Sequence, residues 1–327
     1  MIRTLFFLSL IIFTQIANSQ TIQWRGDNSA GIFEETNLLK SWPKEGPKKI
    51  LSTEGIGAGW GSPISYKEKI YVVGKKDSTD LLSALNMEGE ILWQIPIGDS
   101  WKRSFPDSRT TPTYNDGRLY ALSGSGTLVC IDAETGKQYW AKNVDSIYST
   151  EWHNWGAAES PLVVGDLVIT LPVGNVTAMV ALNKYTGEEI WKTESIGGQR
   201  SYTTPIVYDY NGIRQIIGVT ANDVFAVDPT DGKIIWVYKL SETIAKIKNE
   251  DKKAYIFVNS PIFNERGIYI TEGYDNISIM LELSEDGKSV TEKWIDRTLD
   301  NHHHGVVLID GYIYGSNWYN NRLGNWV

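Results

Sequence analysis

Two short motifs recur in phase along the chain, and this repetition limits what the chain can fold into. The first is a small residue followed by proline at the start of an apolar run, found at Ser62-Pro63, Thr111-Pro112, Ser160-Pro161, Thr204-Pro205 and Ser260-Pro261, with a sixth copy, His304-Gly305, that has glycine instead. The second is Asp or Asn, then Gly, then Trp four residues later: Asn86…Gly89…Trp93, Asp132…Gly136…Trp140, Asn183…Gly187…Trp191 and Asp228…Gly232…Trp236, with a longer fifth copy, Asp286-Gly287…Trp294. Intervals of 44 to 56 residues are typical of a repeat architecture.

Each repeat has the pattern of four short strands. In residues 111–142, runs rich in β-branched and aromatic residues occupy 111–114, 118–122, 127–131 and 137–141, and Gly, Asp, Asn and Ser fill the breaks. Evenly spaced runs of this kind, without helical periodicity, predict an all-β architecture. A four-stranded unit that repeats about every 48 residues matches one blade of a β-propeller.

Blade packing explains the regular tryptophans. One small antiparallel sheet can bury neither face alone, whereas sheets stacked around an axis bury both. We expect the five motif tryptophans to fill the gaps between neighbouring blades: Trp93, Trp140, Trp191, Trp236 and Trp294. The repeats predict five complete four-stranded blades near residues 60–98, 109–144, 158–195, 202–240 and 258–297, and part of a sixth at 303–327, and hence a truncated propeller of seven or eight blades. Residues 241–254 are interpreted as a short surface helix or lid inserted between two blades.

The N-terminus has the pattern of an export signal. Arg3 precedes the apolar stretch 5–12, and small residues at 17 and 19 suit a signal peptidase. We therefore expect a signal peptide at 1–19, an N-terminal segment at 20–56 that carries a closing strand at 48–53, and the propeller at 57–327. No later stretch reaches the roughly 18 apolar residues of a transmembrane helix. The sequence thus predicts an exported protein, periplasmic or secreted, without a transmembrane span.

Charge and cysteine content exclude several classes of partner and site. The net charge of −8 argues against a nucleic-acid partner, which needs a basic face. The single cysteine, Cys130, excludes an internal disulfide framework and a cysteine-based zinc site. Because Cys130 falls inside a predicted third strand, we expect it to be a buried core thiol.

The segment Ile131–Trp140 resembles the tryptophan-docking motif of the pyrroloquinoline-quinone-like (PQQ-like) propellers, and Leu182–Trp191 and Val227–Trp236 match it too. The resemblance extends over residues 57–327, and Trp24–Asn28 resembles the start of secreted bacterial PQQ-like repeat proteins. This family contains quinoprotein alcohol dehydrogenases and the outer-membrane protein assembly propellers, which are not enzymes. The chain lacks the adjacent cysteines typical of the dehydrogenases and the lipidated cysteine of the assembly propellers.

Candidate site residues come from segments that precede the first strand of each blade, because such segments gather around one mouth of a propeller channel. Several of these positions carry polar or aromatic side chains that suit a stacked or hydrogen-bonded ligand. With one residue from a connecting loop, His153, the predicted ligand-binding set is Trp60, Arg109, His153, Glu159, Arg200, Tyr202, Asn259 and His303. The alternative is a polar channel whose side chains form internal salt bridges.

A metal site is a weaker alternative at the same mouth. On an extended segment His302 and His304 would face one way and His303 the other. Two imidazoles on one side, together with Glu159 or His153 across the channel, are candidate ligands for a transition metal, and Asn259 is a further candidate. The other interpretation, which we favour, is that these histidines belong to a loop or the channel wall, since no HExxH helix supports a metal centre.

The sequence favours an exported, non-catalytic binding or scaffold propeller that contacts a small polar ligand or a partner protein at its channel mouth. The first alternative, implied by the family resemblance, is a PQQ-dependent alcohol or sugar dehydrogenase with PQQ and Ca²⁺ as cofactors and Glu159 and Asn259 as candidate calcium ligands. The second alternative is a glycan- or polymer-binding module. The sequence leaves the ligand and the oligomeric state open.

Overall fold

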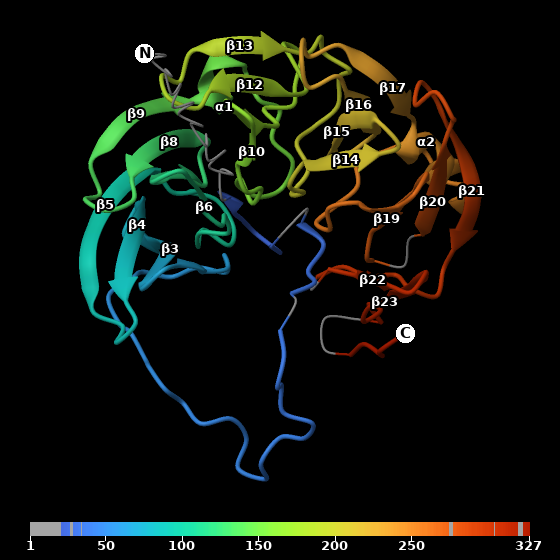
Figure 1. Ribbon diagram of the computed structural model, residues 1–327. Helices are drawn as coiled ribbons and strands as arrows, with labels where there is room; N and C mark the ends of the chain where they lie inside the picture. The colour runs from blue at the N-terminus through green and yellow to red at the C-terminus, as the bar shows by residue number, and fades with distance from the viewer. Residues whose placement is uncertain (1–20, 27–28, 34, 275–276, 304, 320–322) are drawn as a thin grey trace, which may run out of the picture.

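The computed structural model describes residues 21–26, 29–33, 35–274, 277–303, 305–319 and 323–327. Four four-stranded sheets and one five-stranded sheet, all antiparallel, follow one another around an axis, and a two-stranded sheet comes last (Figure 1). The four strands of each blade lie in chain order, with the first near the centre and the fourth at the periphery, and the extra strand of the five-stranded sheet lies at its inner edge. This arrangement is an all-β propeller, as the repeats predict.

The blades have the following strands. Blade 1 holds β2 (Ile64–Tyr66), β3 (Lys69–Lys76), β4 (Thr79–Asn86) and β5 (Ile91–Asp99); blade 2 holds β6 (Thr113–Asn115), β7 (Arg118–Leu122), β8 (Thr127–Asp132) and β9 (Gln138–Asn143). Blade 3 holds β10 (Leu162–Val164), β11 (Leu167–Thr170), β12 (Val180–Asn183) and β13 (Glu189–Lys192); blade 4 holds β14 (Ile206–Tyr210), β15 (Ile213–Val219), β16 (Val224–Val227) and β17 (Ile234–Tyr238). Blade 5 holds β18 (Ile262–Asn264), β19 (Gly267–Thr271), β20 (Ser278–Leu283) and β21 (Val290–Asp296), and β22 (Val307–Ile309) pairs with β23 (Tyr312–Tyr314) beyond it.

The core lies between the blades and not inside any one of them. In β7 the side chains of Leu119 and Ala121 pack against blade 1, whereas those of Tyr120 and Leu122 pack against blade 3, and all four are fully buried. Because alternate residues of a strand point to opposite faces, a strand covered on both faces must be apolar throughout. Cys130 in β8 is likewise fully buried, as predicted.

The motif tryptophans join consecutive blades. At three junctions the indole N–H donates to a backbone carbonyl in the turn of the next blade: Trp93 to Glu134 at 3.1 Å, Trp140 to Lys184 at 3.2 Å and Trp191 to Pro229 at 3.1 Å. The turn glycine lies against each ring, so that a Cβ at Gly136, Gly187 or Gly232 would lie 2.9, 2.8 or 2.6 Å from the indole. These glycines also have positive φ, which other residues rarely adopt.

At the fourth junction, the indole N–H donates to a side chain and not to a backbone carbonyl. Trp236 donates its indole N–H to Oε1 of Gln215 at 3.0 Å, and Nε2 of Gln215 donates to the carbonyl of Gly287 at 2.6 Å. Gln215 therefore links the indole of Trp236 to the turn of the next blade. Trp294 departs from the prediction, because 39% of this residue stays exposed.

The N-terminal segment also differs from its prediction. Residues 48–53, for which a closing strand is predicted, form no strand, although the hydroxyl of Thr53 donates to the carbonyl of Gly89 at 2.9 Å. Instead β1 (Thr21–Ile22) pairs with β6 at the inner edge of blade 2. Arg25 then donates to the carbonyl of Val306, next to β22, so this segment links blade 2 to the last sheet.

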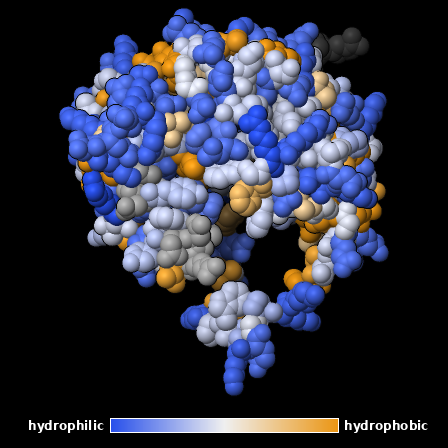
Figure 2. Space-filling model, turned by 180° about the vertical axis from the view of Figure 1, so that it is seen from behind, coloured by the Kyte–Doolittle hydropathy of each residue, from blue (hydrophilic) through white to orange (hydrophobic). Residues whose placement is uncertain are grey.

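Residues 35–50 project away from the sheets on the open side of the ring, and an opening separates this loop from the blades (Figures 1 and 2). The face in Figure 2 is mostly hydrophilic, with hydrophobic side chains in small separate groups.

The two helices in the described part of the chain occupy connections between blades: α1 (Val144–Ile147) follows blade 2 and α2 (Leu240–Lys248) follows blade 4. The predicted helix at 241–254 is shorter than expected, and its inner face packs into the core through Leu240 and Ile244. Among the described residues, neither helix has the length and apolar character needed to cross a membrane.

Candidate functional site

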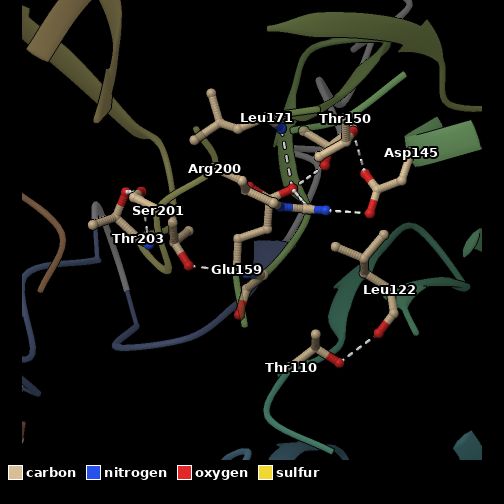
Figure 3. A network of polar contacts seen from close by, with 12 residues as sticks. Thr110, Leu122, Asp145, Thr150, Glu159, Leu171, Arg200, Ser201 and Thr203 are labelled. Atoms are coloured by element: carbon tan, nitrogen blue, oxygen red, sulfur yellow. Dashed lines mark hydrogen bonds and ion pairs between the residues drawn. The ribbon is translucent and has the colours of Figure 1, made fainter. Parts of the chain in front are cut away.

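A buried ion network lies where the segment after blade 2 meets the segments before blades 3 and 4, the place for which a channel mouth is predicted (Figure 3). Arg200, which precedes blade 4, pairs with Asp145 of α1 at 2.5 Å and with Glu159, which precedes blade 3, at 2.9 Å. Glu159 also accepts hydrogen bonds from the Thr170 hydroxyl and, at 3.0 Å, from the Leu171 N–H. All three charged side chains are buried, and Arg200 is only 2% exposed.

Burial and charge pairing have opposite effects on the pKa values of Glu159 and Arg200 in this network. Burial raises the pKa of the Glu159 carboxyl and outweighs the opposing effect of Arg200. Burial by itself would lower the pKa of Arg200, but the carboxylates of Asp145 and Glu159 raise it overall. The network thus links segments next to three blades through charges that pair with one another, although Nε of Arg200 has no hydrogen-bond partner among the described residues.

Aromatic side chains form a layer beside the ion network. The Tyr202 ring lies 5.4 Å from Trp155 and 6.2 Å from His153, centroid to centroid, and Trp155 lies 6.3 Å from Phe105. The Tyr202 hydroxyl accepts the backbone N–H groups of Asn154 and Trp155 at 2.9 and 3.0 Å, which fixes the loop before blade 3. Burial lowers the pKa of His153, which favours a neutral imidazole.

The exposed part of the mouth comes from the loops before blades 1 and 2. We define the mouth rim as Trp60, Phe105 and Arg109. Trp60 is 75% exposed and Phe105 is 65% exposed. The backbone N–H of Trp60 donates to the Ser108 carbonyl at 2.7 Å. The guanidinium of Arg109 donates to the carbonyls of Phe105 and Asp107, so the three rim residues lie on two adjacent, cross-linked segments.

The other predicted residues lie at the far side of the mouth, where blade 5 meets the last sheet. The Asn259 side-chain amide donates to Oδ1 of Asn301 at 2.6 Å, and its oxygen accepts the Gly305 N–H at 3.1 Å. His302 is buried with its ring 4.2 Å from Tyr274, and burial lowers its pKa to about 3. His303 is exposed beside it, with the two imidazole centroids 4.0 Å apart.

The structure does not bring the proposed metal ligands together. Glu159 belongs to the ion network and Asn259 to the amide network near Asn301, and His304 lies outside the described residues. In the described ranges, no group of three or more His, Cys, Asp or Glu side chains is arranged to hold a metal ion.

Sequence reasoning missed two residues of this region. Asp145 lies in α1, after the last strand of blade 2, and therefore outside the segments before first strands from which most of the predicted site residues come. Phe105 was missed as well, although an exposed apolar residue in a loop beside Trp101-Lys102-Arg103 was a usable signal.

Glu272, near the mouth side of blade 5, is a further buried carboxyl. It is 1% exposed, and its Oε1 accepts the Ile256 N–H at 2.8 Å. Its Oε2 has no hydrogen-bond partner among the described residues, and burial raises its pKa from 4.5 to about 8. The carboxyl is therefore mainly protonated at neutral pH.

This raised pKa predicts how the stability of the fold depends on pH. Between about pH 4.5 and 8 the native state keeps a proton that the unfolded state releases, so the Glu272 contribution falls as pH rises, by up to about 1.4 kcal/mol per pH unit. We expect Glu272→Gln to unfold at a higher temperature than the wild type at pH 8, with a difference that shrinks toward pH 5. Thermal unfolding at both pH values measures this, and Glu285→Gln, at an exposed site, is the control. An unchanged difference at the two pH values would contradict the assignment.

The strand topology and the docking of fourth-strand tryptophans onto turns of the next blade together define a β-propeller of the PQQ-like class. Within that class, the chain belongs to the family described as outer membrane protein assembly factor BamB, which matches residues 51–326.

The individual relatives have low sequence identity to this chain. The chain is 24% identical to BamB of Yersinia pestis over 68% of its own length and 54% of the relative, and 24% identical to an uncharacterised protein of Rickettsia conorii over 78% and 54%. It therefore spans about half the length of these curated relatives. It is also 31% identical to a quinoprotein ethanol dehydrogenase of Pseudomonas aeruginosa, over 44% of this chain and 24% of that one. The crystal structure of BamB from Moraxella catarrhalis matches with a TM-score of 0.51 at 17% identity, covering 79% of this chain and 69% of that one, which supports the fold alone.

The quinoprotein relatives raise the question of whether this mouth fits PQQ and Ca²⁺. Calcium is held by several carboxylate and carbonyl oxygens that face one point. Here the carboxylate of Glu159 faces the positive charge of Arg200, and the amide oxygen of Asn259 accepts the Gly305 N–H. The residues present do not fit a calcium ion bound by Glu159 and Asn259.

Proposed function

We propose that this protein is an exported binding propeller that holds a partner polypeptide at its mouth rim and acts in the assembly of outer membrane proteins, as the names of its BamB relatives suggest. The exposure of Trp60 and Phe105 beside Arg109 is the observation that carries the proposal. Tryptophan and arginine are enriched among the residues that contribute most to protein–protein binding, and large aromatic side chains provide much apolar contact area.

A partner polypeptide fits the mouth better than a small polar ligand does. Arg200, Glu159, Asn259 and Tyr202 already bond to other parts of the protein. A ligand would have to displace those partners, and leaving a buried charge unpaired is costly. The exposed side chains of Trp60 and Phe105 need no such rearrangement, whereas Arg109 already donates to two carbonyls of its own loop.

The chemistry of the rim favours an unfolded outer membrane protein as partner. Strands of outer membrane barrels alternate apolar and polar residues and carry aromatic residues near the membrane interfaces. Trp60 and Phe105 would contact the aromatic and apolar side chains, and Arg103, whose guanidinium lies 5.1 Å from the Trp101 ring, adds a positive charge nearby. Export of the mature chain into the periplasm and a complete ring of seven or eight blades are parts of the same proposal.

Binding of a labelled, urea-unfolded eight-stranded outer membrane protein, diluted into buffer, tests the proposal by fluorescence anisotropy. We expect Trp60→Ala and Phe105→Ala each to weaken binding about 30-fold, in the range of interface hot spots. Tyr139→Ala and Ile190→Ala remove exposed apolar side chains from the fourth strands of blades 2 and 3 and serve as matched controls. No binding by the wild type, or equal losses in the controls, would contradict the proposal.

The dehydrogenase alternative has its own measurement, because relatives of that activity are among the matches. The protein is incubated with PQQ and Ca²⁺, and alcohol oxidation is followed with an electron-accepting dye. We expect no turnover. Turnover that depends on both additions would favour the dehydrogenase over the scaffold.

A further inference from the structure

One buried tryptophan lies next to the mouth rim and is not one of the motif tryptophans. Trp101 begins the segment 101–109, here called the rim loop, which carries Phe105 and Arg109 of the mouth rim. Trp101 is 7% exposed, whereas residues 102–105, which follow it, are exposed. A large aromatic side chain is thus buried at the point where the rim loop leaves blade 1.

The Trp101 side chain fills a slot between two glycines from different segments. A Cβ at Gly156, in the loop before blade 3, would lie 2.7 Å from Cβ of Trp101 and 2.9 Å from its Cγ. A Cβ at Gly124, in the turn between β7 and β8, would lie 2.8 Å from the backbone nitrogen of Trp101 and 3.4 Å from its Cβ. The Ala157 N–H donates to the Gly124 carbonyl at 3.0 Å, which joins the two sides of the slot. The two glycines therefore leave the room that Trp101 occupies.

The indole also belongs to a row of aromatic and cationic groups. The centroid of the Trp101 ring lies 4.8 Å from that of Trp152, and the guanidinium of Arg200 lies 5.2 Å from the Trp152 centroid. Aromatic pairs and cations over aromatic rings attract each other at such distances. Because Arg200 is the central cation of the ion network, the row connects the start of the rim loop to that network.

The rim loop has a shape of its own, because the guanidinium of Arg109 donates to the carbonyls of Phe105 and Asp107. Directly after the loop, the Thr110 hydroxyl donates to a carbonyl of β7 at 2.6 Å, which fixes that end. The direction in which the loop projects therefore depends on its other end, where Trp101 is the large buried side chain.

We infer that Trp101 is a positioning residue of the mouth rim: its indole, held in the glycine slot and against Trp152, sets where Phe105 and Arg109 lie. This role rests on the proposed function of the rim, since positioning matters only if the rim binds a partner. Contact residues that are already in place lose less conformational entropy on binding. Trp101 acts through the loop, because its own side chain is buried.

Packing, and not a hydrogen bond, holds the indole of Trp101. Its N–H is buried and has no hydrogen-bond partner among the described residues. Trp101→Phe therefore removes no hydrogen bond and keeps an aromatic ring in the slot, whereas Trp101→Ala empties the slot. Comparison of the two variants shows whether the ring is what positions the loop.

A fluorine label on the rim measures the position of the loop without any partner. The Phe105 ring lies 6.3 Å from the Trp155 ring, so the fluorine NMR signal of 4-fluorophenylalanine at position 105 depends on that contact. We expect Trp101→Ala to move this signal toward that of the unfolded chain and Trp101→Phe to keep it near its native position. Gly156→Ala displaces Trp101 without removing it and should also move the signal, which keeps the test available if Trp101→Ala does not fold.

Binding of the labelled outer membrane protein measures the consequence for the rim. We expect Trp101→Ala to weaken binding about 10-fold, a loss typical of an important interface position. When Phe105→Ala is already present, Trp101→Ala should weaken binding by at most about threefold, because residues that act through one another are not additive. Trp101→Phe should restore most of the affinity.

Trp191→Ala is the matched control. Trp191 is 6% exposed, but it lies in the fourth strand of blade 3, at the periphery of the ring. Its loss should lower stability and leave both the fluorine signal and the binding unchanged, with all variants compared where circular dichroism shows them to be folded.

Several results would overturn the inference. These are an unmoved fluorine signal in both Trp101→Ala and Gly156→Ala, a Trp101→Phe variant that behaves like Trp101→Ala, or an equal loss of binding in Trp191→Ala. Failure of the wild type to bind the outer membrane protein would instead contradict the proposed function. The fluorine signal would still show whether Trp101 positions the loop.

Discussion

Replacing Arg200 by methionine is expected to lower the free energy of unfolding by about 3–5 kcal/mol, the usual cost of removing one partner from a buried ion pair. Methionine is similar in length but leaves the carboxyl groups of Asp145 and Glu159 buried without a positive charge. Urea unfolding followed by circular dichroism measures the loss. Arg214→Met is the matched control, because Arg214 and Asp209 are both 56% exposed, and an exposed pair contributes little.

The pH dependence of this variant has a defined sign. The pKa of Glu159 is already raised by burial, and Arg200 is the main group that opposes the rise. Without Arg200 the native state binds the proton more tightly still, so the deficit should grow as pH increases above the ordinary carboxyl range and shrink as pH falls. A triple variant, Arg200→Met with Asp145→Asn and Glu159→Gln, should recover part of the stability. A deficit that is constant from pH 5 to pH 8 would contradict this account.

Trp140→Ala is expected to cost about 3–5 kcal/mol, because it leaves a cavity between blades 2 and 3 and removes the hydrogen bond to Lys184. The Tyr120 hydroxyl, which also donates to the Lys184 carbonyl at 3.1 Å, would lose the ring beside it. The midpoint of urea unfolding measures the change.

Trp294→Ala is the matched control for Trp140→Ala, since it changes the same residue type at the same place in a blade. Trp294 is 39% exposed and lacks the covering turn, so we expect a loss below about 1.5 kcal/mol. Equal losses at the two positions would show that the turns contribute little and would weaken the inter-blade account.

Much of the architecture could be predicted because the strand and turn patterns of each repeat depend on residues that are close together in the sequence. For blade 2 the predicted strands at 118–122 and 127–131 agree closely with β7 (Arg118–Leu122) and β8 (Thr127–Asp132). Turn residues and β-branched runs act over a few residues, so they can be recognised in the sequence. No strand forms at 48–53, where a closing strand was expected, because a segment becomes a strand only if an open sheet edge lies beside it.

The candidate site was less predictable. The sequence placed Glu159, Arg200 and Tyr202 at one mouth, but it could not show that Glu159 and Arg200 pair with each other and with Asp145. A paired charge and a ligand-binding charge look identical in a sequence, since the difference depends on distances of a few ångströms between remote segments. Whether the mouth rim binds a partner remains a prediction.

The sequence by itself determined the class of fold, the strands of most blades and the family, because repeated turns and strand patterns are local and each copy reinforces the others. Only the tertiary structure decided which side chains are buried in contacts between blades and which remain exposed at the mouth rim. It also decided that Gln215 serves the fourth junction and that Trp294 is left open. The physical reason is that burial and pairing are properties of neighbours in space, and in a ring of stacked sheets those neighbours come from different repeats.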